Sequence, residues 1–185
     1  MKRFKITALA LALTAFTAAG AAYAADNDMS RGDTRFLQKA AQAGKLEIDA
    51  SRLAAERAQD QQVKDFAQKM ITEHTAVDQE LRTLAQTKKV ELPTDLRWGQ
   101  GRTIKSLEDE EGHDFDEEYA DKIAVDAHED AVELFKDAAE DADDAQVKAF
   151  AAKVLPNLEK HLAMGKELQA AIKQKGDAEN ASQRA

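Results

Sequence analysis

Apolar residues in this chain recur at alternating spacings of four and three, and that spacing most limits what the chain can fold into. Residues three and four apart lie on the same face of an α-helix, so each such run predicts a helix that buries one side. No run shows the strict alternation typical of a β-strand. The spacing therefore predicts an all-α bundle of four helices. The four runs are Phe36, Ala40, Ala43, Glu47, Ala50 and Ala54; Val63, Ala67, Met70, His74, Val77, Leu81 and Leu84; Ala124, His128, Ala131, Phe135 and Ala138; and Val147, Ala151, Val154, Leu158, His161, Gly165, Leu168 and Ile172.

The chain also repeats itself, because segment 54–69 recurs 84 residues later as segment 138–153. Asp60 and Asp144 occupy equivalent places in the two copies, each between the end of one periodic run and the start of the next. A carboxylate at that place can accept the free N–H groups at the start of the following helix. The repeated unit is therefore a helical hairpin, with turns near Asp60 and Asp144.

The two hairpins are joined by residues 88–115, a connection far longer than the roughly two to eight residues usual between bundle helices. We expect a short helix within residues 94–110, with Trp98 and Leu107 packing on the outside of the bundle. A connection of this length can run the full height of a bundle, as in ferritin-like folds with a single crossover. We therefore expect a ferritin-like four-helix domain over residues 33–175, preceded by a flexible segment 25–32 and followed by a disordered tail 176–185.

The first 24 residues have the features of a secretory signal. Lys2, Arg3 and Lys5 precede the apolar stretch 6–22, and Ala22-Tyr23-Ala24 provides a small-x-small cleavage site. The alternative, a transmembrane anchor, is weaker because the stretch is short for a span and rich in Ala, Thr and Gly. We expect cleavage after Ala24, no transmembrane helix in the mature chain, and a location in the periplasm or at the outer membrane.

Composition narrows the classes of function. The chain has no Cys, so it has neither disulfides nor a lipid-carrying Cys, and its core alone must hold the fold. Loss of the three basic residues of the signal would leave 23 basic against 35 acidic side chains, a formal net charge of −12. That surface argues against binding to nucleic acid or anionic lipid. With four Ser and no Ser/His/acid order, the chain offers little basis for nucleophilic catalysis, so we do not expect an enzyme.

Four polar residues stand where apolar ones are expected, and each lies on a different helix: Glu47, His74, His128 and His161. Glu47 and His74 are symmetric about the first turn, and His128 and His161 about the second. At ~1.5 Å per residue the first pair lies about 20 Å from its turn and the second about 25 Å. If the two turns lie at opposite ends, all four residues meet near the middle of the bundle.

Such a group has two interpretations. The first is a divalent-metal site built from imidazole and carboxylate, holding Zn, Cu, Fe or Mn. The second is a buried polar layer of hydrogen-bonded His and Glu with trapped water. A di-iron centre is disfavoured because no Glu stands three residues before any of these histidines. Nearby acids such as Glu73 are expected to face solvent.

These segments together resemble a bacterial envelope family known as domain of unknown function 4142. The resemblance covers about residues 33–168 and is carried by motifs in both hairpins: Leu46-Glu47-Ile48, Val63-Lys64-Asp65-Phe66-Ala67, Glu73-His74, Leu92-Pro93, Phe115-Asp116, His128, Phe150-Ala151 and Leu155-Pro156 through His161-Leu162. It implies a ferritin-like bundle in the periplasm or at the outer membrane and assigns no reaction. The leading hypothesis is a non-enzymatic envelope protein that acts by binding, with an envelope protein as partner or under envelope stress. The alternative is a metal-binding or metal-dependent redox bundle.

Overall fold

The structure is a computed structural model, and it describes residues 29–183. The expected signal, residues 1–24, lies outside this range. Every regular element within the described range is helical, which confirms the all-α prediction. No helix in this range combines the length and apolar character needed to cross a bilayer. The helices are α1 (Arg31–Arg57), α2 (Gln61–Thr87), α3 (Trp98–Asp109), α4 (Gly112–Tyr119), the π-helix η1 (Ala120–Ala127), α5 (His128–Asp141) and α6 (Ala145–Gln183).

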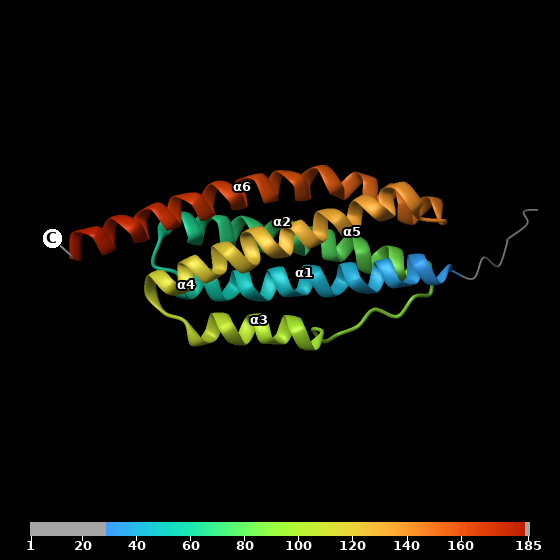
Figure 1. Ribbon diagram of the computed structural model, residues 1–185. Coiled ribbons are helices and arrows are strands. Elements are labelled where there is room, and N and C mark those ends of the chain that lie inside the picture. Colours follow the sequence, from blue (N-terminus) through green and yellow to red (C-terminus); the bar gives the residue numbers. More distant parts are fainter. Residues whose placement is uncertain (1–28, 184–185) are drawn as a thin grey trace, which may run out of the picture.

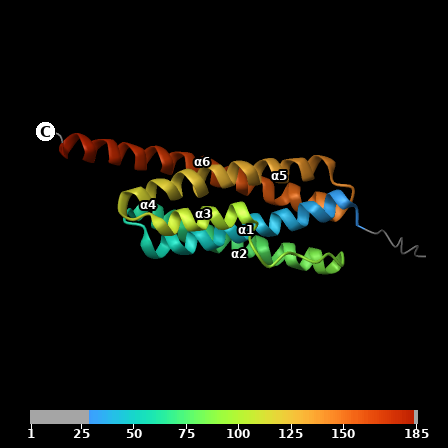
Figure 2. The ribbon, with the colours of Figure 1, turned by 60° about the horizontal axis from the view of Figure 1, so that its bottom comes forward.

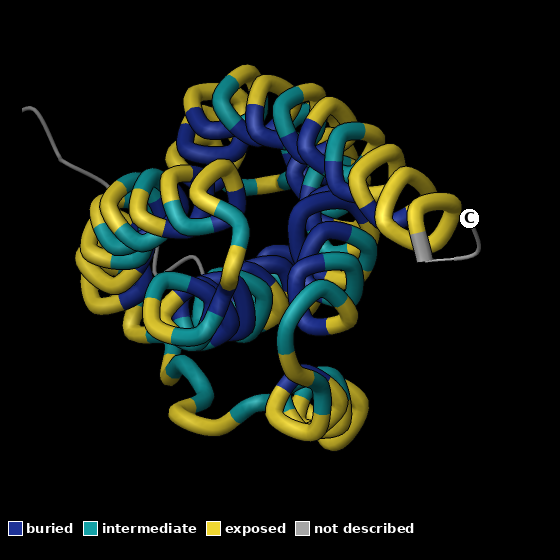
Figure 3. The backbone as a smooth tube through the Cα atoms, turned by 90° about the vertical axis from the view of Figure 1, so that its left-hand side faces the viewer, coloured by how far each residue is buried: buried dark blue, intermediate teal, exposed yellow. Residues whose placement is uncertain are grey.

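The bundle consists of four long helices (Figures 1 and 2). The third of them is formed by α4, η1 and α5, which follow one another without interruption. α1 pairs with α2, and α5 pairs with α6. The α1–α2 turn lies at the end of the molecule where α4 begins, and the α5–α6 turn lies at the other end (Figure 1). Seen end-on, the buried residues of the long helices face one another, and α3 lies outside them (Figure 3).

Carboxylates organise both hairpin turns. Asp60 accepts a hydrogen bond from the backbone N–H of Gln62 at 2.8 Å, and Asp144 accepts one from Gln146 at 2.9 Å, which confirms the predicted caps. A second, buried carboxylate from the other half of the chain reaches each turn. Asp116 accepts from the backbone N–H of Asp60 at 2.7 Å, and Asp33 accepts from that of Asp144 at 2.9 Å. Each turn is therefore held both by its own cap and by the opposite hairpin.

Both ends of the helical domain differ from the expectation. α1 begins at Arg31, inside the segment expected to be flexible, because the Ser30 hydroxyl caps it by accepting from the N–H of Asp33 at 3.0 Å. α6 continues to Gln183 instead of ending before a disordered tail at residue 176. Gly176, the first residue of the expected tail, is a buried contact point, since a Cβ there would lie 2.2 Å from His113 Nε2. The last turns of α6 extend beyond the bundle (Figures 1 and 2).

The crossover contains the expected short helix, α3, which runs along the outside of the bundle (Figure 1). Leu107 is fully buried, as predicted. Trp98 is not: its side chain is 78% exposed, and the guanidinium of Arg102 lies over its ring at 4.9 Å. The prediction that Trp98 packs on the bundle was wrong, because its ring lies against Arg102 of the same helix and is otherwise open to solvent.

The third long helix contains one residue more than its counterpart in the first hairpin. Asp33 corresponds to Asp116 at an offset of 83 residues, whereas Ala54 corresponds to Ala138 at an offset of 84, and all four are buried. The additional residue falls in the stretch that contains η1. A π-helix forms i→i+5 hydrogen bonds, so it accommodates an inserted residue without breaking the helix. His128 directly follows η1, so this insertion sets which way the residue faces.

α6 approaches η1 closely at Gly165. A Cβ at that position would lie 1.9 Å from the carbonyl oxygen of Ala124, a backbone atom that cannot rotate away. Because Gly165 has no side chain, the backbones of α6 and η1 are in direct contact at this position. The fourth helix can lie against the third at the level of His161 only because this residue has no side chain.

Substitution of Gly165 by Ala should destabilise the protein by at least about 2 kcal/mol, because α6 must move away from η1 to admit the methyl group. Gly44, in the interior of α1, is the matched control, since a Cβ there meets nothing within 4 Å. Gly44→Ala should instead stabilise by about 0.5–1 kcal/mol through reduced chain entropy in the unfolded state. Urea unfolding of the two variants measures both effects, and equal effects would contradict the close contact at Gly165.

Candidate metal centre

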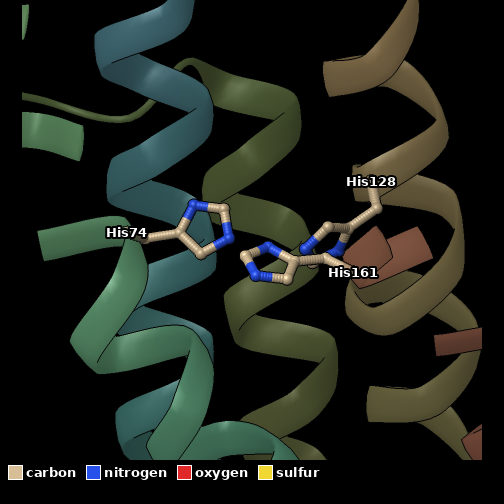
Figure 4. A group of neighbouring side chains, drawn as sticks. All are labelled: His74, His128 and His161. Carbon is tan, nitrogen blue, oxygen red and sulfur yellow. The ribbon is translucent and has the colours of Figure 1, made fainter. Parts of the chain in front are cut away.

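The three core histidines come together at one level between the helices. His74 lies on α2, His128 at the start of α5 and His161 on α6, and all three are at most 3% exposed. Their ring centroids are 5.2–5.6 Å apart, and the three rings lie together between the helices (Figure 4). One nitrogen atom from each ring lies within 4.8 Å of one from each of the others. The three histidines, which their distances from the two turns predict to lie at one height, are therefore close together in the structure.

Each histidine uses one ring nitrogen to contact a neighbouring oxygen. His74 Nδ1 donates to Glu47 Oε2 at 2.7 Å, and His128 Nδ1 donates to the carbonyl oxygen of Ile123 at 2.8 Å. His161 Nε2 contacts Glu73 Oε2 at 2.5 Å. Because a carbonyl and a carboxylate accept, the protonated nitrogen of each neutral ring is the one that makes this contact. These contacts determine the orientation of every ring, and they determine the tautomer of each ring that is neutral.

The remaining nitrogen of each ring has no hydrogen-bond partner among the described residues. These atoms are His74 Nε2, His128 Nε2 and His161 Nδ1, and all three are buried. A buried polar atom without a partner costs about 1–3 kcal/mol, and the large majority of buried polar atoms have one. Three such atoms, directed into the same space from three helices, form a set of donor atoms.

Glu47 lies beside this set and is not one of its three grouped donors. Its Oε2 accepts from His74, and its Oε1 is buried with no partner in the described part of the chain. The structure thus brings all four predicted residues together, with Glu47 as the group that orients His74. Metal-ligating histidines almost always donate their other N–H to a carboxylate or a carbonyl in this way.

Glu73 contacts the histidine cluster, although the sequence predicts that it faces solvent. Its side chain is 29% exposed, and its Oε2 accepts from His161 and from Asn157, the latter at 3.0 Å. Lys69 contacts its other oxygen. The sequence contains one indication of this contact. Asn157 and His161 are four residues apart and so share one helix face, and Glu73 directly precedes His74, which lies in the same layer as His161. Helical periodicity places Glu73 beside the buried face of α2 and not on it. Only the packing of α6 against α2 brings this side chain into contact with His161.

The ionisation of Glu47 and His74 is coupled. Burial raises the pKa of Glu47, but attraction to His74 and then to His128 outweighs burial, so this pKa lies below its usual value. Burial lowers the pKa of His74, yet the charge and hydrogen bond of Glu47 leave it raised. Without metal, the two groups therefore form a buried ion pair.

The other two histidines are held neutral. Burial lowers the pKa of His128, and burial lowers that of His161 to about 4 even though Glu73 opposes the shift. Burial raises the pKa of Glu73, but hydrogen bonds from Lys69, His161 and Asn157 bring it down to about 2. A neutral imidazole has a lone pair on its unprotonated nitrogen, so His128 and His161 are in the form that ligates metals at neutral pH.

The donor set fits a transition-metal ion. Imidazole nitrogens bind Zn, Cu and Fe at about 2.0–2.1 Å, so ligands of one ion lie within about 4.2 Å of each other. The present limit of 4.8 Å requires only a modest inward movement of the rings. None of the three core histidines has the Glu three residues before it that di-iron bundles use as an additional ligand, so the arrangement suits a single ion.

Solved structures with the same fold include one protein, CopM, with bound metal. A fragment of a protein named DUF305 from Deinococcus radiodurans has a TM-score of 0.68 at 11% identity, covering 77% of this chain and 98% of its own. CopM in its Cu(II)-bound form has a TM-score of 0.63 at 16% identity, covering 75% and 96%. CopM in its Ag-bound form has a TM-score of 0.59 at 17% identity, covering 73% and 93%. At these identities the similarity shows the fold alone.

No functionally curated protein matches the sequence significantly. A family model does match, over residues 18–168, which is most of the chain and includes all three histidines and both glutamates. This match confirms the resemblance found from the motifs of the two hairpins. The chain belongs to the family described as Domain of unknown function (DUF4142).

Proposed function

We propose that this protein binds one transition-metal ion between its four long helices through His74 Nε2, His128 Nε2 and His161 Nδ1. The observation that carries the proposal is that each histidine has one nitrogen oriented by an oxygen and one buried nitrogen that has no partner among residues 29–183 and faces the other two. Glu47, Glu73 and the carbonyl of Ile123 hold the ligands in position. The metal would replace the proton that His74 Nε2 carries in the ion pair with Glu47, and it would accept one lone pair from each of the three rings.

The chemistry of the donors narrows the choice of ion. Imidazole suits Cu, Zn, Fe and Ni, and Cu²⁺ binds most strongly in this series, whereas Mn prefers oxygen ligands. The structural neighbour CopM has been solved with Cu(II) and with Ag. Copper is therefore the first ion to test and zinc the second. The single long crossover also supports our placing the bundle in a ferritin-like architecture, as a variant built for one ion instead of two.

Metal-free protein should take up one Cu²⁺ or Zn²⁺ per chain and melt at a higher temperature with the ion bound. A ligand that binds only the folded state at a hundred times its Kd stabilises by about 2.7 kcal/mol. Titration calorimetry and thermal unfolding measure the two effects. His128→Gln should abolish both, while His113→Gln, at the histidine outside the cluster, should leave them intact. An unchanged melting temperature together with no stoichiometric metal uptake would contradict the metal site. The cluster would then be the buried polar layer without a metal.

The metal-free protein should lose stability on acidification below pH 6.5. His161 has a pKa of 6.5 in the unfolded chain and about 4 in the fold, so the unfolded state binds more protons in that window. The loss is worth about 3 kcal/mol at full effect. The raised pKa of His74 acts in the opposite direction, but its contribution declines only above pH 6.5. Denaturant unfolding between pH 6.5 and 4 should show a shallower decline for His161→Gln, and an identical decline would contradict the neutral imidazole.

We further propose that the protein is exported and acts by binding in the periplasm or at the outer membrane. Support comes from the basic start, the apolar stretch and Ala22-Tyr23-Ala24. An exported binding protein without cysteine would rely on imidazole for transition metals. Its role would be to hold or deliver the ion, not to catalyse a reaction.

Export predicts a mature chain that begins at Ala25 in the periplasmic or envelope fraction of expressing cells. Intact-mass spectrometry of the fractionated protein measures this directly. Ala24→Asp should block cleavage, because a charged residue does not fit the small-residue site. Recovery of the chain from the cytoplasm with Met1 still attached would refute export.

A further inference from the structure

A large cleft lies on one side of the metal centre. It has a volume of about 880 Å³ and lies between α1, the start of α3, and the helix formed by η1 and α5. The exposed Trp98 stands at the α3 side, and Leu46 and Leu134 contribute apolar wall. The crossover therefore forms one wall of this cleft, since α3 lies outside the core.

The wall formed by η1 and α5 is acidic. Asp126, Asp130, Glu133 and Asp137 all line the cleft and are all exposed, and their spacing of four, three and four places them on one helix face. Lys122, which also lines the cleft, is paired with Asp126 at 3.1 Å. Lys39 and Arg97 are the other basic residues of the lining, so acids outnumber bases. Acidic clefts with low-dielectric walls raise the local concentration of cations.

The inner end of the cleft is the carboxylate of Glu47. This residue lines the cleft although it is only 1% exposed, and its Oε1 has no partner within the described chain. Its Oε2 accepts from His74, one of the three proposed ligands. A buried carboxylate oxygen without a donor is costly, and a cation is the partner that it lacks.

A second, small cavity continues from the same carboxylate. It has a volume of about 20 Å³, enough for one water molecule, and both Glu47 and His74 line it. Ala43, Glu47 and Ala131 line both this cavity and the cleft, so these three residues form the partition between them. Two of the three have only a methyl side chain, so the partition is thin.

The opposite side of the centre is closed by satisfied groups. Glu73 stands there, and both of its carboxylate oxygens have partners, Lys69 on one and Asn157 with His161 on the other. A cation arriving from that side would have to break this network. The two glutamates that orient histidines therefore differ: Glu73 is saturated, whereas Glu47 has one oxygen free.

We propose that this cleft is the access route of the metal centre, along which a hydrated divalent cation passes the acidic face of α5, binds transiently to Glu47 Oε1, and moves through the Ala43–Ala131 partition to the histidines. The inference rests on the proposed metal site. It adds a direction of approach and assigns a transient ligand to Glu47.

The test is the rate of Cu²⁺ uptake by metal-free protein, followed by stopped-flow absorbance of the copper–imidazole complex. Ala43→Leu places a larger side chain in the partition and should slow both uptake and release at least tenfold, with Kd unchanged. Ala76→Leu is the control, because Ala76 is exposed on α2 and does not line the cleft.

A second pair of variants tests the acidic face and avoids the core. Asp130→Asn with Asp137→Asn should lower the uptake rate several-fold at low salt and weaken its salt dependence, with little change in release. Glu140→Gln with Asp141→Asn removes the same charge from exposed sites of α5 that do not line the cleft, and should leave uptake unchanged. Wild-type kinetics in both Ala43→Leu and the Asp130/Asp137 variant, with equilibrium binding intact, would overturn the route alone. No binding by the wild-type protein at equilibrium would overturn the proposed function together with the route.

Discussion

The core of this protein has to accommodate three imidazoles and a carboxylate at one level of an otherwise apolar bundle. An ionised carboxylate is expensive to bury unless it is paired, and here Glu47 is paired with His74 at 2.7 Å. His128 and His161 avoid the cost of burying a charge by staying neutral. Each of the four long helices contributes one of these groups, so the helices cannot shift along one another without separating the layer. The polar layer therefore specifies the relative heights of the helices.

Two backbone features make this arrangement sterically feasible. The π-helix accommodates the one additional residue of the third long helix and places His128 Nδ1 next to the carbonyl oxygen of Ile123. Gly165 then allows α6 to approach η1 to direct backbone contact, just after His161 on the same helix. π-helical turns occur frequently at functional sites, since they reorient side chains at the cost of poorer backbone hydrogen bonds. The buried aspartates at the turns, Asp33 and Asp116, hold the ends of the bundle while its middle deviates from regular geometry.

The two faces of the polar layer are not equivalent. On the α2–α6 side, Glu73 is engaged by Lys69, Asn157 and His161. On the α1–α5 side, Glu47 has one oxygen without a hydrogen-bond partner in the described part of the chain, at the base of a cleft whose outer wall is α3. The long crossover thus does more than connect two hairpins. Its helix α3 forms one wall of the cleft that reaches the polar layer at Glu47. The exposure of Trp98 follows from the same arrangement, since this residue stands at the margin of the cleft and not against the core.

Sequence alone determined the helices, the hairpins and the meeting of Glu47, His74, His128 and His161. Helical periodicity is local, and two turns marked by Asp60 and Asp144 convert residue number into height along a bundle. Only the tertiary structure decided what depends on rotation and lateral packing. It turned Glu73 towards His161, left Glu47 Oε1 without a partner among the residues described, placed the π-helix before His128 and extended α6 through Gly176 to Gln183. Those outcomes depend on which side chains of the adjacent helix lie opposite each helix face. Residue spacing gives the height of a residue along the bundle, but it does not give the rotation of one helix against the next.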